Sequence, residues 1–455
     1  MFISVVRIVG VLLALISLTM CIPVAAALVY GEYALIPAFV IPAAVCIVFE
    51  AILFFLTRGS VFKLNSRTGY IVVAFSWLGA CFFGALPFLL SGCIPAFDDA
   101  LFESVSGFTT TGATILSEVE NLPRSINLWR MQMHWLGGMG IFPLTVALLP
   151  ILGVGGFQLI KAETTGPEKG KITPKITVTA KILWFIYIAL TLVQTVLLMC
   201  TGMDFFDALG HSFATVGTGG FSSRNASIGS YRSVGAEWIC TIFMILAGVN
   251  FSLYFHLFTG KPEEFFRNSE LRAYIRIIFF AGIGIALALV PVYGLSAAFR
   301  HSFFHVASIM TTTGFSTVNY CAWPAFAQAL LFLLMFVGGC SGSTAGGIKV
   351  IRWVILRKQA FNEMQRLLHP HGVFSIQLNR RPGRKDVVYS VAGFIFVYFV
   401  CLLVTFLAAA LTGTDILTDI AASLTLVGNI GAAFGKVGSG GDFSFFPHWA
   451  KVVFS

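Results

Sequence analysis

The sequence predicts an all-α polytopic membrane protein, made of an N-terminal helix pair followed by four tandem repeats around a pseudo-fourfold axis. Each repeat is expected to contain a span, a re-entrant pore hairpin and a second span. Two observations predict this fold. Of 455 residues, 57% are hydrophobic and 11% are charged, which leaves too few polar side chains to cover a soluble globule of this size. In addition, one short segment rich in threonine and glycine recurs four times between long apolar runs.

Nine apolar runs approach the ~20 residues that a helix needs to cross a bilayer. They lie at about 8–30, 35–57, 70–92, 131–153, 182–201, 236–259, 274–293, 324–337 with its continuation, and 388–411. The first run contains Ala25-Ala26-Ala27, which resembles a signal-peptidase site. Its apolar stretch is longer than the roughly 7–15 residues of a signal core, however, so we expect a retained helix.

Residues 1–57 form the helix pair without a threonine and glycine segment, and Pro23, Pro37 and Pro42 bound or kink its helices. The four predicted repeats then occupy 70–160, 175–260, 272–366 and 386–455. Two crossings plus a hairpin that returns to its own side leave every repeat in the same orientation. The four repeats can therefore surround one axis, unlike the inverted halves of many secondary transporters.

The recurring segment is aligned on four glycines: Gly112, Gly220, Gly314 and Gly431. A large apolar residue stands fifteen positions before each glycine, and a small residue stands six positions before it. The large residues are Phe97, Phe205, Phe299 and Ile416, and the small ones are Ser106, Ala214, Ser308 and Thr425. Two of the four copies contain the tetrapeptide Thr-Thr-Thr-Gly.

A half-length helix followed by such a glycine can form part of an ion filter. Glycine permits the positive φ that lets successive carbonyls point the same way, and carbonyl rings from four loops replace the hydration shell of K⁺ in selectivity filters. The candidate filter residues are Thr110, Thr111, Gly112, Gly219, Gly220, Thr312, Thr313, Gly314, Asn429, Ile430 and Gly431. The alternative is an ordinary helix end with a glycine cap. That alternative is favoured for a single copy and disfavoured by four aligned copies between spans.

The closing span of the third repeat is interrupted by a glycine-rich stretch from Gly338 to Lys349. Five glycines exclude a stable helix there, and irregular backbone at membrane depth is tolerated where it lines a cavity. We therefore predict a gating loop below the filter, formed by Gly338, Gly339, Ser341, Gly342, Ser343, Thr344, Gly346 and Gly347. A phosphate-binding loop does not fit, because Ile348 follows the last glycine where lysine is required. A helix kink without a gating role remains open.

The distribution of charge predicts the orientation. Of 29 lysines and arginines, 22 fall at Arg7 and in the segments 58–69, 161–181, 260–276 and 349–385. By the positive-inside rule, these segments and the N-terminus are cytoplasmic. The hairpins then open outward together with Asp98, Asp99, Glu103, Asp204, Asp207, Asp415 and Asp419. These side chains predict an acidic outer vestibule that concentrates cations, although ordinary solvated loop charges are an equal alternative.

The basic segment 357–386 predicts a cytoplasmic hairpin or amphipathic helix that faces anionic lipid or a soluble protein. We expect no nucleic-acid partner. The eight histidines show no HExxH or paired-carboxylate spacing, and the nine cysteines form no CxxC or Cys/His pattern. We therefore expect no catalytic residues, no covalent cofactor and no metal besides K⁺ at the filter. A disulfide or metal role for Cys93, Cys321 or Cys340 is a minor alternative.

On several of these motifs together, the chain resembles the Trk/Ktr/HKT superfamily of potassium transporters, and most closely its bacterial TrkH type. The matching stretches are ALFESVSGFTTTGAT (100–114), WLGGMGIFPL with LGVGGFQLIKAET (135–164), GGFSSRNASIGS (219–230), TTTGFSTVNY (311–320), GGCSGSTAGGIKVIR (338–352) and GNIGAAFGKVGS (428–439). They extend over most of the chain and are highly specific in combination.

The resemblance implies potassium uptake across the bacterial inner membrane, with the four glycines in the filter and 338–347 as the gate. It also implies a homodimer and a cytosolic nucleotide-binding regulatory ring of the TrkA type. Glycine at all four filter positions implies K⁺ selectivity, since serine at the first position would imply sodium permeation. A poorly selective K⁺/Na⁺ transporter and a non-conducting subunit remain alternatives, and a membrane-embedded enzyme has no support.

Two features depart from the family pattern. Ala345 stands where the family commonly has another glycine. In the family, the fourth repeat closes with a full span that carries a Gly-Arg-Leu-Glu-like motif, whose arginine contacts the gating loop. Residues 448–455 rise only ~12 Å as a helix, less than half of a ~30 Å hydrocarbon core. We therefore expect the last span to be missing, and the 455-residue chain to be incomplete as a transporter unless another helix completes the wall.

Overall fold

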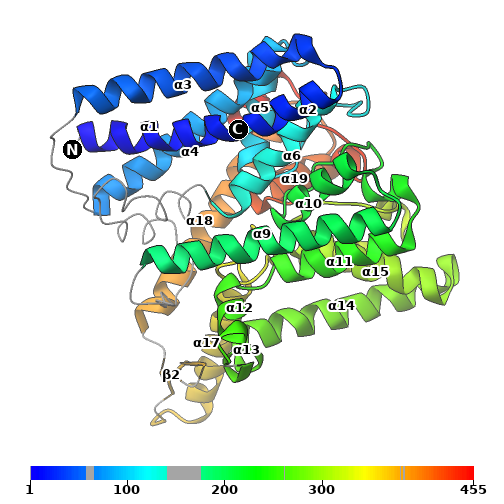
Figure 1. Cartoon of the computed structure of the whole chain (residues 1–455). Coiled ribbons are helices and arrows are strands. Elements are labelled where there is room, and N and C mark those ends of the chain that lie inside the picture. Colours follow the sequence, from blue (N-terminus) through cyan, green and yellow to red (C-terminus); the bar gives the residue numbers. More distant parts are fainter. Residues whose placement is uncertain are drawn as a thin grey trace.

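The computed structural model describes residues 2–57, 66–140, 176–260, 262–372, 374–379, 381–382 and 385–455, and these residues are largely helical (Figure 1). In this part of the chain, six apolar segments are long enough to cross a membrane: Val5–Val29, Tyr33–Leu56, Thr68–Leu90, Ala180–Cys200, Ser269–Tyr293 and Val387–Ala410. The helices that form them are α1 (Phe2–Thr19) with α2 (Cys21–Val29), α3 (Ile36–Leu56), α4 (Ser66–Leu90), α9 (Ile176–Cys200), α14 (Ser269–Tyr293) and α18 (Lys385–Ala410). The prediction of a multi-pass membrane protein is confirmed.

Two of the other predicted spans are interrupted in the described residues. The run predicted at 236–259 consists of α11 (Val234–Ala247) and α12 (Phe251–Phe258), which meet at an angle of 93°. The predicted span is thus broken into two helices, because the residues from Gly248 to Asn250 are not helical. The run predicted at 324–337 contains α16 (Ala325–Leu334), and α17 (Val350–Leu368) begins only after the glycine-rich stretch. The run predicted at 131–153 begins inside α6 (Arg124–Gly138), and its part beyond residue 140 lies outside the described residues.

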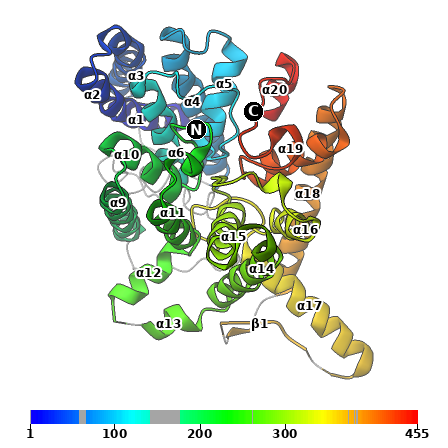
Figure 2. The ribbon, with the colours of Figure 1, turned by 90° about the vertical axis from the view of Figure 1, so that its right-hand side faces the viewer.

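Four shorter helices each follow a long one and pack against it: α5 (Phe97–Phe108) on α4, α10 (Phe205–Val216) on α9, α15 (Leu295–Met310) on α14, and α19 (Ile416–Gly428) on α18. Figure 2 shows these four pairs arranged around a common centre. The N-terminal helices α1 and α3 pack on α4, at the outside of the first pair. The expected half-length helices are therefore present in all four places.

A carboxylate from the N-terminal region fixes the start of α6. Glu32 accepts hydrogen bonds from the backbone nitrogens of Arg124 (2.7 Å) and Ser125 (2.9 Å) and from the Ser125 hydroxyl (2.6 Å). The first amides of a helix lack partners within the helix, and a negative charge at that end is stabilising. Glu32 therefore ties the N-terminal helices to the element that follows the first glycine segment.

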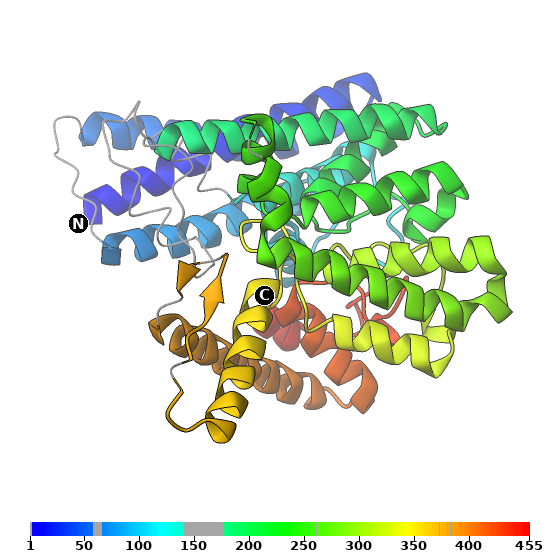
Figure 3. The ribbon, with the colours of Figure 1, turned by 90° about the horizontal axis from the view of Figure 1, so that it is seen from below.

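Small elements complete the described chain: the helices α13 (Pro262–Arg267) and α20 (His448–Phe454), and the 3₁₀ turns η1 (Tyr33–Leu35), η3 (Ser227–Tyr231), η4 (Tyr320–Ala322) and η5 (Gly435–Val437). Strands β1 (Gln377–Leu378) and β2 (Arg381–Pro382) form an antiparallel pair. The basic segment 357–386 thus contains both alternatives that were predicted, the end of an amphipathic helix and a hairpin. Helix α17 projects from the body of the molecule (Figures 2 and 3) and exposes Phe361, Met364 and Leu367.

Candidate ion-conduction site

The four glycine segments share one backbone conformation. The aligned glycines all have positive φ: 78° at Gly112, 81° at Gly220, 81° at Gly314 and 87° at Gly431. The residue two positions earlier is also left-handed in every segment: Thr110 (60°), Thr218 (55°), Thr312 (56°) and Asn429 (63°). Positive φ at non-glycine residues is uncommon, so its recurrence at four equivalent positions indicates a common design. Two positive φ values separated by one residue let neighbouring carbonyls face the same side.

The small residue six positions before each glycine accepts a hydrogen bond that ends the helix. Its carbonyl receives the amide of the residue directly before the glycine: Thr111 to Ser106 (2.9 Å), Gly219 to Ala214 (2.8 Å), Thr313 to Ser308 (2.8 Å) and Ile430 to Thr425 (2.9 Å). This pattern is the long bond of a Schellman cap, in which the left-handed residue is the cap. The cap is thus a threonine or asparagine, and the alternative in which the aligned glycine caps the helix is wrong.

The four segments meet one another in cyclic order. A β-carbon at Gly112 would overlap the carbonyl oxygen of Gly219, one at Gly220 that of Thr313, and one at Gly314 that of Ile430. A β-carbon at Gly431 would lie 2.7 Å from the carbonyl oxygen of Thr111, which closes the ring. Each glycine therefore faces the carbonyl that precedes the next glycine, and such a close approach of two backbones requires a residue without a side chain.

Side-chain and backbone bonds strengthen the joint between the last segment and the first. The Asn429 amide nitrogen donates to the carbonyls of Thr109 (2.9 Å) and Thr110 (3.2 Å), and the Thr111 hydroxyl donates to the Asn429 carbonyl oxygen (2.5 Å). Further out, the amide of Phe443 donates to the Thr114 carbonyl (2.8 Å). These hydrogen bonds thus join two segments that are more than 300 residues apart in sequence.

The extended chain segments that follow the other glycines are also hydrogen-bonded to neighbouring segments. Between the second and third segments, the Gly229 amide donates to the Ser316 carbonyl (3.2 Å). Between the third and fourth, the Tyr320 hydroxyl donates to the Ala433 carbonyl (2.6 Å). These bonds hold the segments against sliding relative to one another.

Most of the acidic residues expected to line an outer vestibule have structural roles. Glu103, Asp207 and Asp419 are buried, so the prediction that they form an open acidic vestibule is wrong. Glu103 forms an ion pair with Arg130, which satisfies its charge inside the protein. Asp207 accepts a hydrogen bond from the Ser223 hydroxyl (2.6 Å), and Asp419 accepts one from the Thr414 hydroxyl.

Two further acidic residues, Asp204 and Asp415, cap the starts of helices. Asp204 accepts from the Asp207 amide (2.9 Å) at the start of α10, and Asp415 accepts from the Thr418 amide (3.1 Å) at the start of α19. Hydrogen bonds from the Thr418 side chain and backbone lower the pKa of Asp415. These carboxylates are therefore helix caps, as ordinary loop acids often are.

Among the described residues, Asp98, Asp99 and His448 form the one group of histidine, cysteine, aspartate and glutamate side chains close enough to share a metal ion. Asp98 is paired with His448 (2.5 Å) and Asp99 with Lys451 (2.6 Å). The ammonium group of Lys451 already balances the charge of Asp99, so the group does not need a metal ion. The two contacts join α5 to α20. All nine cysteines are free, which excludes a disulfide at Cys93, Cys321 or Cys340 in this structure.

The glycine-rich stretch 338–347 forms a loop that is anchored on the break between α11 and α12. The amide of Cys340 donates to the Gly248 carbonyl (2.8 Å), and the amide of Phe251 donates to the Gly342 carbonyl (3.0 Å). The loop also closes on itself, since the Gly338 amide donates to the Ile348 carbonyl (2.9 Å). The predicted loop residues thus lie together, beside the irregular part of the neighbouring span.

The far end of this loop contacts the glycine segments. The Gly346 amide donates to the Thr312 hydroxyl (2.6 Å), and a β-carbon on Gly346 would lie 2.7 Å from that of Asn429. Thr312 and Asn429 are the left-handed caps of the third and fourth segments. The loop therefore borders the ends of the segments where the short helices stop, rather than an outer face of the molecule.

Two residues that hold this loop were missed by sequence reasoning. Glu270, at the start of α14, accepts hydrogen bonds from the amides of Ser341 (2.6 Å) and Ile351 (3.0 Å). Lys349 donates from its ammonium group to the Ala345 carbonyl. Both side chains are buried. A charged residue next to an apolar span is a signal that could have identified them.

The fold and the arrangement of the glycine segments agree with the comparison to known proteins. Residues 35–455 match the family model described as cation transport protein, TrkH. This chain belongs to the TrkH family of cation transport proteins.

TrkH-family relatives match nearly the whole length of this chain. The Trk system potassium uptake protein TrkH of Escherichia coli is 41% identical and covers 96% of this chain and 91% of its own length. The protein of the same name from Halomonas elongata is 39% identical, with 98% and 94% covered. The crystal structure of the potassium transporter TrkH from Vibrio parahaemolyticus superposes with a TM-score of 0.88 at 37% identity, covering 100% of this chain and 94% of that chain. The resemblance drawn from the motifs is confirmed.

Proposed function

We propose that this TrkH-family chain takes up K⁺ across the bacterial inner membrane, with its N-terminus in the cytoplasm. The observation that carries the proposal is the closed ring, in which each of four glycines faces the carbonyl before the next glycine. The E. coli and H. elongata relatives are named potassium uptake proteins. The transported ion is the substrate, and the proposal includes no covalent cofactor and no catalytic residue.

The proposed K⁺ site consists of backbone oxygens from the eleven candidate filter residues. A dehydrated K⁺ ion needs several oxygen dipoles around it, and carbonyl rings supply them without a fixed charge that would hold the ion too tightly. The repeated left-handed conformations aim neighbouring carbonyls to one side. Glycine at all four aligned positions favours K⁺ over Na⁺ in this proposal, by the family resemblance.

The gate in this proposal is the loop 338–347. In the structure it is held to the segments by the Gly346 to Thr312 bond and to the bend between α11 and α12 by Cys340. Conduction requires the loop to leave the inner ends of the segments. Glycines without side chains, and a few breakable hydrogen bonds, suit a segment that changes conformation.

We further propose that the subunit works as a homodimer with a cytosolic nucleotide-binding regulator of the TrkA type. The relatives are named members of a Trk system. The projecting helix α17 bears exposed apolar side chains, Phe361 and Met364, next to basic Arg357 and Lys358, which suits a protein contact on the cytoplasmic side. A regulator that co-purifies equally well after deletion of 357–386 would remove this segment from the proposed contact.

Tracer uptake into liposomes tests the proposed function. The purified chain is reconstituted, and ⁸⁶Rb⁺ uptake is compared with ²²Na⁺ uptake at equal concentrations and with protein-free liposomes. Selective Rb⁺ uptake that excess K⁺ competes away is the expected result. Equal entry of Na⁺ and Rb⁺ would favour the poorly selective alternative, and correctly folded protein without any uptake would favour a non-conducting subunit.

A further inference from the structure

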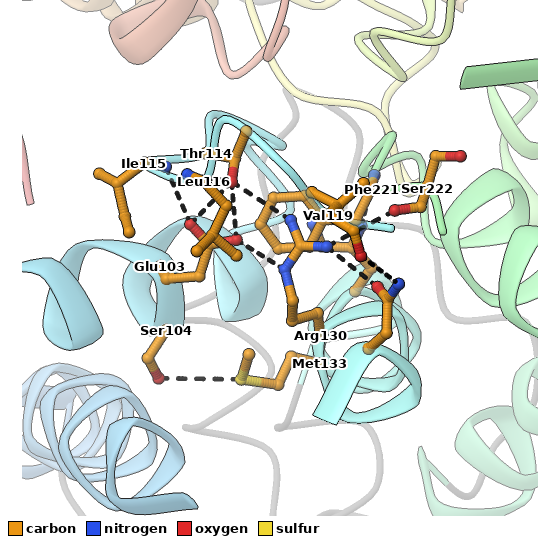
Figure 4. Close-up of polar contacts among 12 residues, drawn as sticks. Glu103, Ser104, Thr114, Ile115, Leu116, Val119, Arg130, Met133, Phe221 and Ser222 are labelled. Carbon is orange, nitrogen blue, oxygen red and sulfur yellow. Dashed lines mark hydrogen bonds and ion pairs between the residues drawn. The ribbon is translucent and has the colours of Figure 1, made fainter. Parts of the chain in front are cut away.

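A buried ion pair lies behind the first two glycine segments. Arg130 on α6 donates from Nε to the carboxylate of Glu103 on α5 at 2.7 Å, and the two side chains are 1% and 0% exposed (Figure 4). Removing two such charges from water costs several kcal/mol per ion unless the geometry and the further hydrogen bonds are good. Residues of this kind at membrane depth commonly have a functional role.

The carboxylate holds the strand that leaves the first glycine. Glu103 accepts hydrogen bonds from the Thr114 hydroxyl (3.0 Å) and from the Ile115 amide (3.1 Å). These residues follow Gly112 by two and three positions. Since Glu103 is on the short helix that leads into the segment, its carboxylate fixes the exit of the hairpin relative to its entry.

The guanidinium group extends the same contact to the second segment. Arg130 donates from Nη1 to the Ser222 carbonyl (3.5 Å) and from Nη2 to the Thr114 hydroxyl (3.2 Å). Its Cζ atom also lies over the ring of Phe221, 4.2 Å from the ring centroid. Phe221 and Ser222 directly follow Gly220. One rigid, planar side chain therefore contacts the strands after two of the four glycines.

The Glu103–Arg130 pair occurs at only one of the four contacts between neighbouring glycine segments in the described chain. The residue nine positions before the aligned glycine is Glu103 in the first segment, and His211, His305 and Ala422 in the others. His211 is within hydrogen-bond distance of the Ser222 hydroxyl (2.8 Å), so a polar contact between entry and exit recurs in the second segment. The joints to the third and fourth segments described above use neutral hydrogen bonds.

We propose that the Glu103–Arg130 pair is a positioning clamp that sets the separation of the first and second glycine segments and thereby the cation selectivity of the ring. The inference rests on the proposed function. A side chain at Gly112 would overlap the Gly219 carbonyl, so the two backbones leave no space for a side chain between them. Releasing the clamp lets this joint widen, and a wider carbonyl cage discriminates less between K⁺ and the smaller Na⁺.

Three substitutions test the clamp by different chemistry. E103Q removes the negative charge and leaves the Arg130 guanidinium without its ion-pair partner. R130K keeps the positive charge but loses the planar guanidinium group, which contacts the segments after both glycines. T114V removes only the hydroxyl that lies between Glu103 and Arg130. The matched control is E237Q, because Glu237 also pairs with an arginine, Arg300, at 2.8 Å but joins α11 to α15. Each variant is assayed for the ratio of ⁸⁶Rb⁺ to ²²Na⁺ uptake and for Tm in detergent.

We expect the uptake ratio to fall about tenfold in E103Q and R130K, the factor associated with losing one hydrogen bond to a charged group. The fall is expected to be smaller in T114V, and E237Q is expected to keep the wild-type ratio. A structural role alone would lower Tm and leave the ratio of the folded protein unchanged, so folded variants with the wild-type ratio would overturn the clamp.

Two further outcomes are decisive. If all three variants fail to fold while E237Q folds, the pair is a requirement of folding and the positioning assignment is wrong. If the wild-type chain itself shows no Rb⁺ uptake, the proposed function fails and the clamp fails with it. Selective wild-type uptake with unchanged variants, in contrast, leaves the proposed function intact and overturns only the clamp.

Discussion

At the residue scale, the aligned glycines are required for two separate reasons. Gly112 has a φ of 78°, which costs an alanine about 1–2 kcal/mol in steric strain. A β-carbon there would also overlap the Gly219 carbonyl. In G112A the carbonyl oxygen of Gly219 must therefore move away from its place in the ring. We expect Rb⁺ uptake to fall about tenfold or more, because each ~1.4 kcal/mol of binding free energy lost from an ion site weakens binding tenfold. Tracer uptake into liposomes measures the effect.

Gly413 supplies a matched control for this substitution. Its φ is 79°, nearly the same as that of Gly112, but a β-carbon there would meet nothing within 4 Å. We expect G413A to lower stability by the same strain of about 1–2 kcal/mol and to keep the wild-type uptake. If G413A and G112A reduce uptake equally, backbone strain alone explains the loss and the ring contact has no special role.

At the scale of elements, the loop 338–347 is held by different contacts at its two ends. Its anchor on the bend after α11 uses backbone bonds, such as that from Cys340 to Gly248 (2.8 Å). Its contact with the glycine segments uses one side-chain hydroxyl, that of Thr312, which accepts from the Gly346 amide (2.6 Å). If the loop is the gate, as proposed, we expect it to release at the segments and to stay anchored at the bend.

T312V removes the acceptor of this bond with little change in shape. A lost hydrogen bond of about 1 kcal/mol corresponds to roughly a fivefold change in an equilibrium, so we expect uptake without the regulator to rise severalfold. The control is T241V, which removes an equally buried hydroxyl bonded within α11 to the Glu237 carbonyl (2.7 Å). Equal uptake in T312V and wild type would show that this bond does not hold a gate closed.

At the scale of the whole molecule, the sequence predicted the spans and the glycine segments because both are encoded locally. A long apolar run is sufficient to indicate a membrane helix, and six such helices were found in the described chain. The small residue six positions before each glycine is part of the sequence pattern. Its physical reason, the carbonyl that accepts the long cap bond, became visible only with the backbone, as between Thr111 and Ser106.

What could not be predicted depends on contacts between distant parts of the chain. Glu103 was expected in an acidic vestibule, because in sequence nothing marks Arg130 as its partner on the next helix. The 93° bend after α11 was likewise hidden in a continuous apolar run, since its position is fixed by bonds with the loop 338–347. The local sequence pattern determines the type of element. Contacts with distant residues determine where a span is broken and whether a charged side chain is exposed or buried in an ion pair.

The ring as a whole closes at the joint between the first and last segments, and Asn429 makes most of the side-chain bonds there. Its amide donates to the carbonyls of Thr109 and Thr110, and its oxygen accepts from the Thr111 hydroxyl. We expect N429A to lower the Rb⁺ to Na⁺ uptake ratio at least about tenfold, since all three of these side-chain hydrogen bonds, of ~1 kcal/mol each, are lost. N319A is the control, because the described hydrogen bond of the Asn319 side chain is a local one, accepted from the nearby Cys321 amide (3.0 Å). A wild-type ratio in folded N429A would mean that the other three joints hold the ring closed by themselves, and closure between the chain's distant ends would then need no side chain.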